Sequence, residues 1–107
     1  MICVSAFEHQ IIIDIIKEYA SDCDVFAFGS RYKWVPKDYS DLDLAFKPKN
    51  GEKLGFDRSW RIKDAFTESD LPYTVDVVDY YATEDYFKAI IDSGNEKIFD
   101  GNNLENM

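Results

Sequence analysis

The chain has 107 residues, of which 46% are hydrophobic and 16% aromatic, which is enough apolar material for one compact domain with a single core. Its 21 acidic residues against 12 lysines and arginines give a formal net charge of -9, which argues against direct binding of long nucleic acid because the phosphates would be repelled. Two cysteines and one histidine exclude a four-ligand zinc site built from these residue types, and the absence of a membrane-length or signal-peptide-like apolar run predicts a cytoplasmic protein without a membrane partner.

The first predicted elements are a helix over residues 6–20 and a strand over residues 25–28. Ser5 and Glu8 have the spacing of a capping box, and the apolar residues that follow recur at helical intervals. The second segment is a short apolar run that ends at Gly29, a pattern typical of a buried strand.

The middle of the chain alternates between polar linkers and short regular segments. Residues 30–40 are polar and predict a loop, whereas residues 41–46 alternate between acids and leucines before becoming apolar, which predicts a second strand. Residues 47–51 contain proline, asparagine and glycine and predict a turn. An amphipathic pattern then predicts a helix that begins near Asp57 and ends before residue 70.

The last third predicts one more strand and one more helix. Residues 73–79 are rich in β-branched side chains and indicate a strand. Thr83 is a candidate N-cap for a final helix that stops at Gly94, and the polar tail is expected to fray beyond Phe99. The order helix, strand, strand, helix, strand, helix predicts a single small α/β domain over residues 1–107.

Two aspartates at the start of the second predicted strand are the first candidates for chemistry. Side chains alternate along a strand, so Asp41 and Asp43 share a face about 7 Å apart, from a rise of ~3.3 Å per residue, while Leu42 and Leu44 point into the core. Two carboxylates this close repel each other unless a cation or solvent relieves them. Mg²⁺ is the hard, oxygen-preferring cation that fits such a pair.

A glycine and a third acid complete the constellation. Gly29 and Ser30 follow a strand and offer two amides and a hydroxyl to a phosphate, which is what phosphoryl or nucleotidyl transfer requires beside metal ions. Asp76 lies among valines in mid-strand, where an unpaired charge is costly, and is the candidate to join the pair and to orient or deprotonate an attacking hydroxyl. Asp79 lies three positions further on and faces the other side of the strand, as a solvated or supporting acid.

These residues resemble a known family over residues 22–99. The run FGSR at residues 28–31, ten residues from 31 to 40, and DLDL at residues 41–44 match the GS-x10-DxD signature of minimal nucleotidyltransferases, small relatives of DNA polymerase β. The run SDLPYTVDVVD at residues 69–79 is similar to the family's strand for the third carboxylate. A lone DxD is weak evidence, whereas the three spaced elements together are specific.

The resemblance implies a polymerase β palm-like α/β (α+β) fold, with a small mixed sheet packed with helices. It implies that ATP is the substrate, that two Mg²⁺ ions act as cofactors, and that the partner is a small all-helical HEPN-type toxin. In such pairs the nucleotidyltransferase is the antitoxin and transfers AMP to a tyrosine hydroxyl of the toxin. Carried over by position, the nucleotide-binding residues are Gly29, Ser30 and Arg31, and the catalytic and metal-binding residues are Asp41, Asp43 and Asp76.

Other interpretations remain open at this point. Relatives carry a glycine shortly after the GS pair where this chain has Trp34, which favours an alternative in which the domain is a catalytically weak module that neutralises a helical HEPN partner by binding it. Transfer to a small molecule is disfavoured because no second domain is present to form an acceptor pocket. Arg31 also suits pairing with surplus acids, and His9 suits a structural role. The aromatic residues around the last helix are read as its core and rim, or as a surface that a partner covers.

Overall fold

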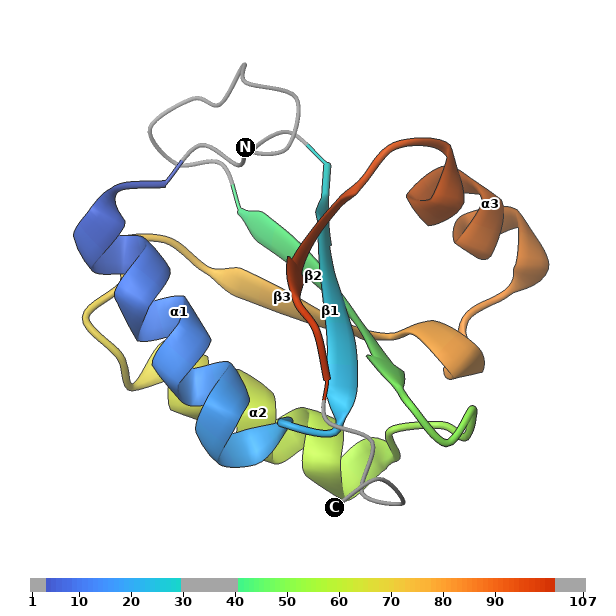
Figure 1. Cartoon of the computed structure of the whole chain (residues 1–107), viewed down its shortest axis with the longest axis horizontal. Coiled ribbons are helices and arrows are strands. Elements are labelled where there is room, and N and C mark those ends of the chain that lie inside the picture. The colour runs from blue at the N-terminus through green and yellow to red at the C-terminus, as the bar shows by residue number, and fades with distance from the viewer. Residues whose placement is uncertain (1–3, 30–40, 102–107) are drawn as a thin grey trace.

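The computed structural model describes residues 4–29 and 41–101 and shows a four-stranded sheet with helices on both faces (Figure 1). The strand order is β3-β2-β1-β4. None of the helices in the described ranges is long and apolar enough to cross a bilayer. The elements in chain order are α1 (Ala6–Tyr19), β1 (Cys23–Phe28), β2 (Leu42–Pro48), α2 (Phe56–Thr67), β3 (Val75–Asp79), the 3₁₀ turn η1 (Tyr80–Ala82), α3 (Asp85–Ser93) and β4 (Glu96–Phe99).

The sheet is mixed, as predicted. β1 runs antiparallel to both β2 and β4, whereas β2 and β3 are parallel. A parallel pair needs a crossover between its strands, and α2 provides it. This arrangement makes β3 one edge of the sheet and β4 the other.

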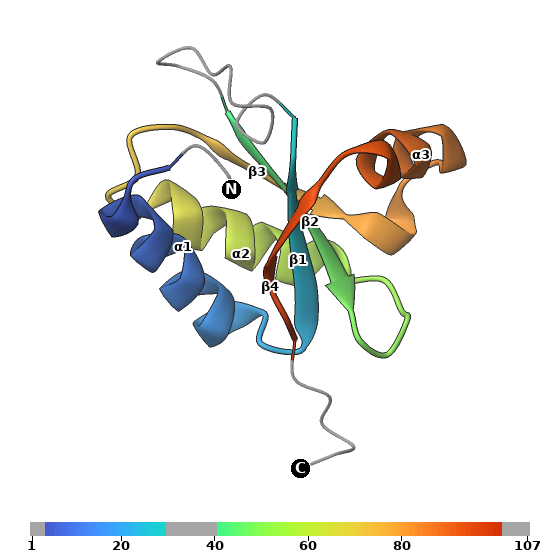
Figure 2. The same ribbon diagram turned by 45° about the horizontal axis from the view of Figure 1, so that its top comes forward.

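The two faces of the sheet carry different cores. α1 and α2 cover one face, and their buried residues Ile12, Ile16 and Ile62 pack with Leu42 and Leu44, all 0% exposed. α3 lies across the other face, as the turned view makes clear (Figure 2). The smaller cluster on this second face contains Phe28, Ala45, Tyr80 and Ile91, with Phe26, Val78, Tyr81 and Phe87 at its margin.

Local signals set most helix ends correctly. The predicted capping box is confirmed, because the Ser5 hydroxyl accepts from the Glu8 amide and the Glu8 carboxylate accepts from the Ser5 amide. The predicted start of the second helix is confirmed too, since α2 follows Gly55, whose φ is 96°. The proposed cap at Thr83 is wrong: Glu84 is the N-cap of α3, and the Thr83 hydroxyl donates to the Tyr80 carbonyl to close η1.

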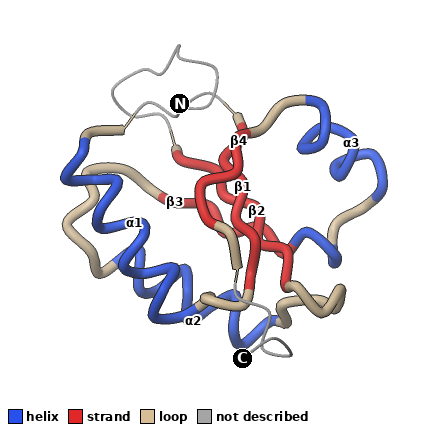
Figure 3. The backbone as a smooth tube through the Cα atoms, in the orientation of Figure 1, coloured by secondary structure: helices blue, strands red, loops and turns tan. Residues whose placement is uncertain are grey.

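Two features were not predicted from the sequence. The second strand continues through Lys47 and Pro48, so the turn begins later than expected. Residues 96–99 form β4, which pairs with β1 at the edge of the sheet (Figure 3). The chain just beyond is held by tertiary contacts, because the Gly101 amide donates to the Asp24 carboxylate and Lys97 pairs with Asp100.

Candidate functional site

Asp41 and Asp43 lie at the start of β2, on the face that α1 and α2 leave uncovered. Asp41 precedes the strand and is exposed, while Asp43 lies within it and is half-buried. Leu42 and Leu44 point into the opposite core, as alternation predicted. The sequence therefore assigned Leu42, Asp43 and Leu44 to the correct sides of β2.

Asp76 lies directly beside Asp43. The two residues are paired in the parallel register of β2 and β3, and the carboxyl group of Asp76 is close enough to that of Asp43 to raise its pKa. Neighbouring strands are about 4.8 Å apart, so two residues in register on the same face bring their side chains together. The parallel pairing thus brings a carboxylate from residue 43 and one from residue 76 to a single place on the sheet.

Gly29 lies against the Asp43 carboxyl group of this pair. It follows β1, whose last residue, Phe28, is paired with Asp43. The backbone of Gly29 has a φ of 81°, which favours glycine, and a Cβ atom added there would collide with the Asp43 carboxylate. Both the backbone conformation and the lack of space for a side chain therefore favour glycine at position 29.

The environment makes Asp43 hard to ionise. The pKa of Asp43 is raised to about 6, first by burial and then by the neighbouring carboxyl group of Asp76 and the negative charge of Asp41. No ion pair among the described residues involves any of these three acids. A cation at this position would remove the repulsion that now favours the protonated form.

The described residues contain no group of three His, Cys, Asp or Glu side chains close enough to hold a metal ion. Asp43 and Asp76 form a close pair, whereas Asp41 acts on Asp43 by charge from an exposed position before the strand. Ser30, Arg31 and Trp34, on which the sequence analysis also relied, fall outside the described residues.

Asp79 belongs to the other face and has a structural role. Its two carboxylate oxygens accept from the amides of Leu54 and Gly55, at 2.9 and 3.0 Å, and so tie the end of β3 to the start of α2. Replacing Asp79 with asparagine removes the charge and one acceptor, and we expect a loss of about 1 kcal/mol in the free energy of unfolding. Chemical denaturation will measure this loss, and any enzymatic rate per folded molecule should be unchanged.

Lys47 is a residue of this face that the sequence analysis missed, because it was assigned to a turn. It lies two pleats beyond Asp43, and its ammonium group is 4.5 Å from the centre of the Tyr80 ring. The rings of Phe26 and Tyr81 are 5.6 and 6.0 Å away. These cation–π contacts hold η1 over the end of the sheet. The aromatic residues around the last helix form core and rim, one of the two predicted arrangements: Tyr80 is buried, Tyr81 and Phe87 are partly buried, and Tyr86 is 72% exposed.

The raised pKa of Asp43 predicts an unusual dependence of stability on pH. Between the pKa of an unfolded aspartate and about pH 6, the folded protein binds this proton more tightly than the unfolded chain does, so the contribution of Asp43 to stability falls as pH rises. After allowance for solvent screening of a half-exposed group, we expect this contribution to be about 1 kcal/mol.

Thermal unfolding will measure the contribution of Asp43 to stability. The wild type and Asp43→Asn are compared in EDTA at pH 5.0 and 7.5. Taking the difference in stability between the two proteins cancels the pH-dependent contributions of the other acids, including Asp22, whose pKa is lowered by Arg58. The variant should be more stable than the wild type at pH 7.5, and this advantage should be clearly smaller at pH 5.0, which lies between the two pKa values of Asp43. An advantage that is equal at both values would contradict the assignment.

Comparison with known proteins identifies the family to which the chain belongs. Residues 10–103 match the family described as "Polymerase beta, Nucleotidyltransferase". The chain is 43% identical over 88 residues to the "Probable protein adenylyltransferase MntA" of Haemophilus influenzae, covering 82% of this chain and 75% of the relative.

Solved structures share the fold at low identity. A "toxin-antitoxin with AMP-PNP" superposes with a TM-score of 0.72 at 18% identity, covering 91% of this chain and 76% of that one. An MNT antitoxin in complex with a tri-AMPylated Shewanella oneidensis HEPN toxin gives a TM-score of 0.66 at 18% identity, covering 94% and 75%. Together with the match over residues 10–103, these findings show that the chain belongs to the polymerase β nucleotidyltransferase family.

Proposed function

We propose that this chain, acting as one minimal domain, is a Mg²⁺-dependent adenylyltransferase that moves AMP from ATP to a hydroxyl group of a HEPN-type toxin, for which it is the antitoxin. The observation that carries the proposal is the meeting of Asp43, Asp76 and Gly29 at one point of the sheet. The relative at 43% identity, named as a protein adenylyltransferase, supports the choice of reaction.

In this proposal each residue has one task. Gly29, Ser30 and Arg31 bind the triphosphate, with the bare backbone of Gly29 allowing close approach of a phosphate. The metal ligands are Asp41, Asp43 and Asp76. Their carboxylate oxygens are the donors that Mg²⁺ prefers, and burial together with the neighbouring acids raises the pKa of Asp43, a cost that a bound cation would offset. Bound Mg²⁺ supplies charge neutralisation of the phosphate oxygens.

The transfer itself is a substitution at the α-phosphorus of ATP. The acceptor oxygen forms a bond to this phosphorus, the bond to the bridging oxygen of the β-phosphate breaks, and pyrophosphate leaves. Asp76 orients the acceptor hydroxyl and receives its proton. Asp76 is only half-buried, which leaves part of its side chain within reach of a protein hydroxyl.

Radiolabelled ATP tests the reaction directly. A HEPN-family protein encoded beside this chain is incubated with the chain, Mg²⁺ and ATP that is labelled on either the α- or the γ-phosphate. We expect the HEPN protein to gain the α-label but not the γ-label, and to gain neither in EDTA. Asp41→Asn combined with Asp43→Asn should abolish the labelling.

A second function belongs to a different class, and the lack of a close three-acid group among the described residues favours it. Here the domain neutralises the HEPN protein by binding alone. The same variants distinguish the two functions. If Asp41→Asn with Asp43→Asn still neutralises the toxin while no label is transferred, the domain is a binding module and not an enzyme.

A further inference from the structure

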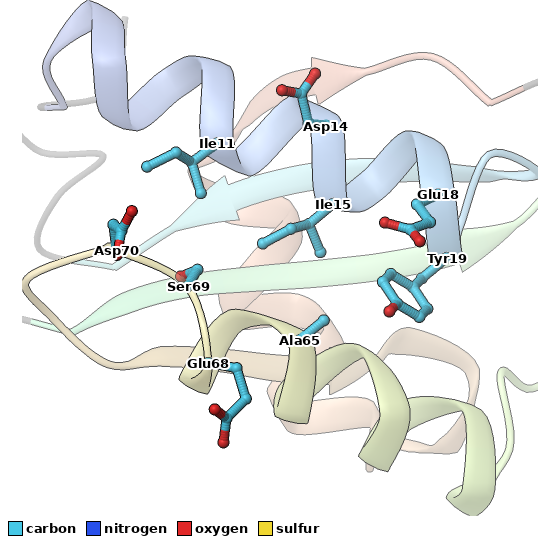
Figure 4. Close-up of a pocket in the computed structure, with 9 residues that line it drawn as sticks. All are labelled: Ile11, Asp14, Ile15, Glu18, Tyr19, Ala65, Glu68, Ser69 and Asp70. Atoms are coloured by element: carbon cyan, nitrogen blue, oxygen red, sulfur yellow. The ribbon is translucent and has the colours of Figure 1, made fainter.

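A groove lies between α1 and α2, on the opposite side of the sheet from Asp43 and Asp76. Its volume is about 400 Å³. Ile11 and Ile15 point from α1 toward α2, where Ala65 faces them (Figure 4). All three are only half-buried, so the groove has an apolar floor that the rest of the fold leaves in contact with solvent.

The rim of this groove is acidic. Of its nine lining residues, four are acids and none is a lysine, arginine or histidine. The four acids are exposed, and no ion pair among the described residues involves them. They are Asp14 and Glu18 on α1, Glu68 at the end of α2, and Asp70 in the loop that follows.

Folding does not explain the position of two of these acids. Glu18 lies in the last turn of α1, and Glu68 is the C-cap residue of α2. The C-terminal end of a helix carries a partial negative charge, so a cation is favoured there and a carboxylate is not. The last turn of α1 contains Lys17, whereas the last turn of α2 contains no basic residue. A ligand that fits this groove would have an apolar stripe to cover the floor and positive charges on both sides of the stripe to pair with the acidic rim.

We propose that this groove docks a basic amphipathic helix of the acceptor protein. Aliphatic side chains of that helix would cover Ile11 and Ile15, and its lysines or arginines would face the acidic rim. A second copy of this chain fits poorly, because each copy has a net charge of -9. The inference rests on the proposed function only for the identity of the protein that supplies the helix.

Docking at this groove would place the acceptor close to the candidate site without blocking it. The chain leaves the groove at Asp70 and enters β3, which is the edge strand of the sheet and carries Asp76 on its other face. A protein held against α1 and α2 can therefore reach around β3. Such tethering raises the effective concentration of its hydroxyl group at the site.

The affinity of the full chain for the purified HEPN-family acceptor, measured by calorimetry, tests this surface. We expect Glu18→Lys combined with Glu68→Lys to weaken binding about tenfold or more. Both lysines would lie at helix C-terminal ends, where they do not destabilise the fold. The matched control is Glu52→Lys with Asp64→Lys, two exposed acids outside the groove, which changes the net charge equally and should leave the affinity within about twofold.

Methyl NMR gives a readout that does not depend on charge. Addition of the acceptor should shift the signals of Ile11 and Ile15 but not that of Ile90, which is 55% exposed on α3. Equal affinities for the groove and control variants, or no binding by the wild type, would overturn the docking site. Binding through the groove without transfer of the α-label would instead leave the docking site standing and overturn the proposed reaction.

Discussion

Replacing Asp43 with asparagine should lower the rate of AMP transfer by on the order of 10³-fold. The side chain keeps its size but loses the charge that the proposed function assigns to a metal ligand. Because Asp43 is half-buried and repelled by Asp76, the variant should fold at least as well as the wild type at pH 7.5. Lost activity and retained stability together distinguish a functional carboxylate from a structural one.

The matched control is Asp79→Asn, which changes the same group on the opposite face of the neighbouring strand. Asp79 bonds to the amides of Leu54 and Gly55 and not to the acid pair, so this variant should lose stability and keep its rate per folded molecule. Single-turnover transfer of the α-label, with circular dichroism melts of the same samples, measures both quantities. A transfer rate for Asp43→Asn within tenfold of the wild-type rate would show that Asp43 is not a catalytic residue.

Gly29→Ala is the second change with a large expected effect. The new Cβ atom would collide with the Asp43 carboxylate and displace it from its position beside Asp76. A displacement of about 1 Å in a reacting group can cost on the order of 10²-fold in rate, and we expect a loss of this size. The positive φ of Gly29 adds backbone strain of about 1 kcal/mol.

Gly51→Ala separates collision from strain. Gly51 has a φ of 77°, close to the 81° of Gly29, but no atom lies within 4 Å of the position of its Cβ. This variant should show the strain in its unfolding free energy and leave the transfer rate intact. The rate loss of Gly29→Ala should also be much smaller in an Asp43→Asn background, since both changes act on one group. Equal rates for the two alanine variants would show that the space beside Asp43 is unimportant.

Local patterns were sufficient where a segment carried its own stabilising contacts. The limits of α1 followed from the Ser5 and Glu8 capping box and from apolar residues at helical spacing, which need no distant partner. The strand β4 was missed because only four residues form it and its stability comes from pairing with β1. The cap at Thr83 was misassigned because η1, a turn made by Tyr80 and its neighbours, uses that hydroxyl.

The sequence by itself selected the candidate residues for the chemistry and, for those within a strand, the side of the strand on which each one lies. The family signature selected the acids and the glycine, and the period of two along a strand separated Asp43 from Leu42 and Asp76 from Asp79. Both kinds of information are contained in short segments of the chain, so no tertiary contact was needed to obtain them.

Only the tertiary structure decided which of these residues meet. The register of β2 against β3 brings Asp43 beside Asp76, which lies 33 positions further along the chain. The register of β1 against β2 brings Gly29, which lies 14 positions before Asp43, next to the Asp43 carboxylate. The raised pKa of Asp43 follows from this proximity and from burial. The acidic groove between α1 and α2 likewise exists only after two distant helices pack together, because register, burial and packing are properties of pairs of segments.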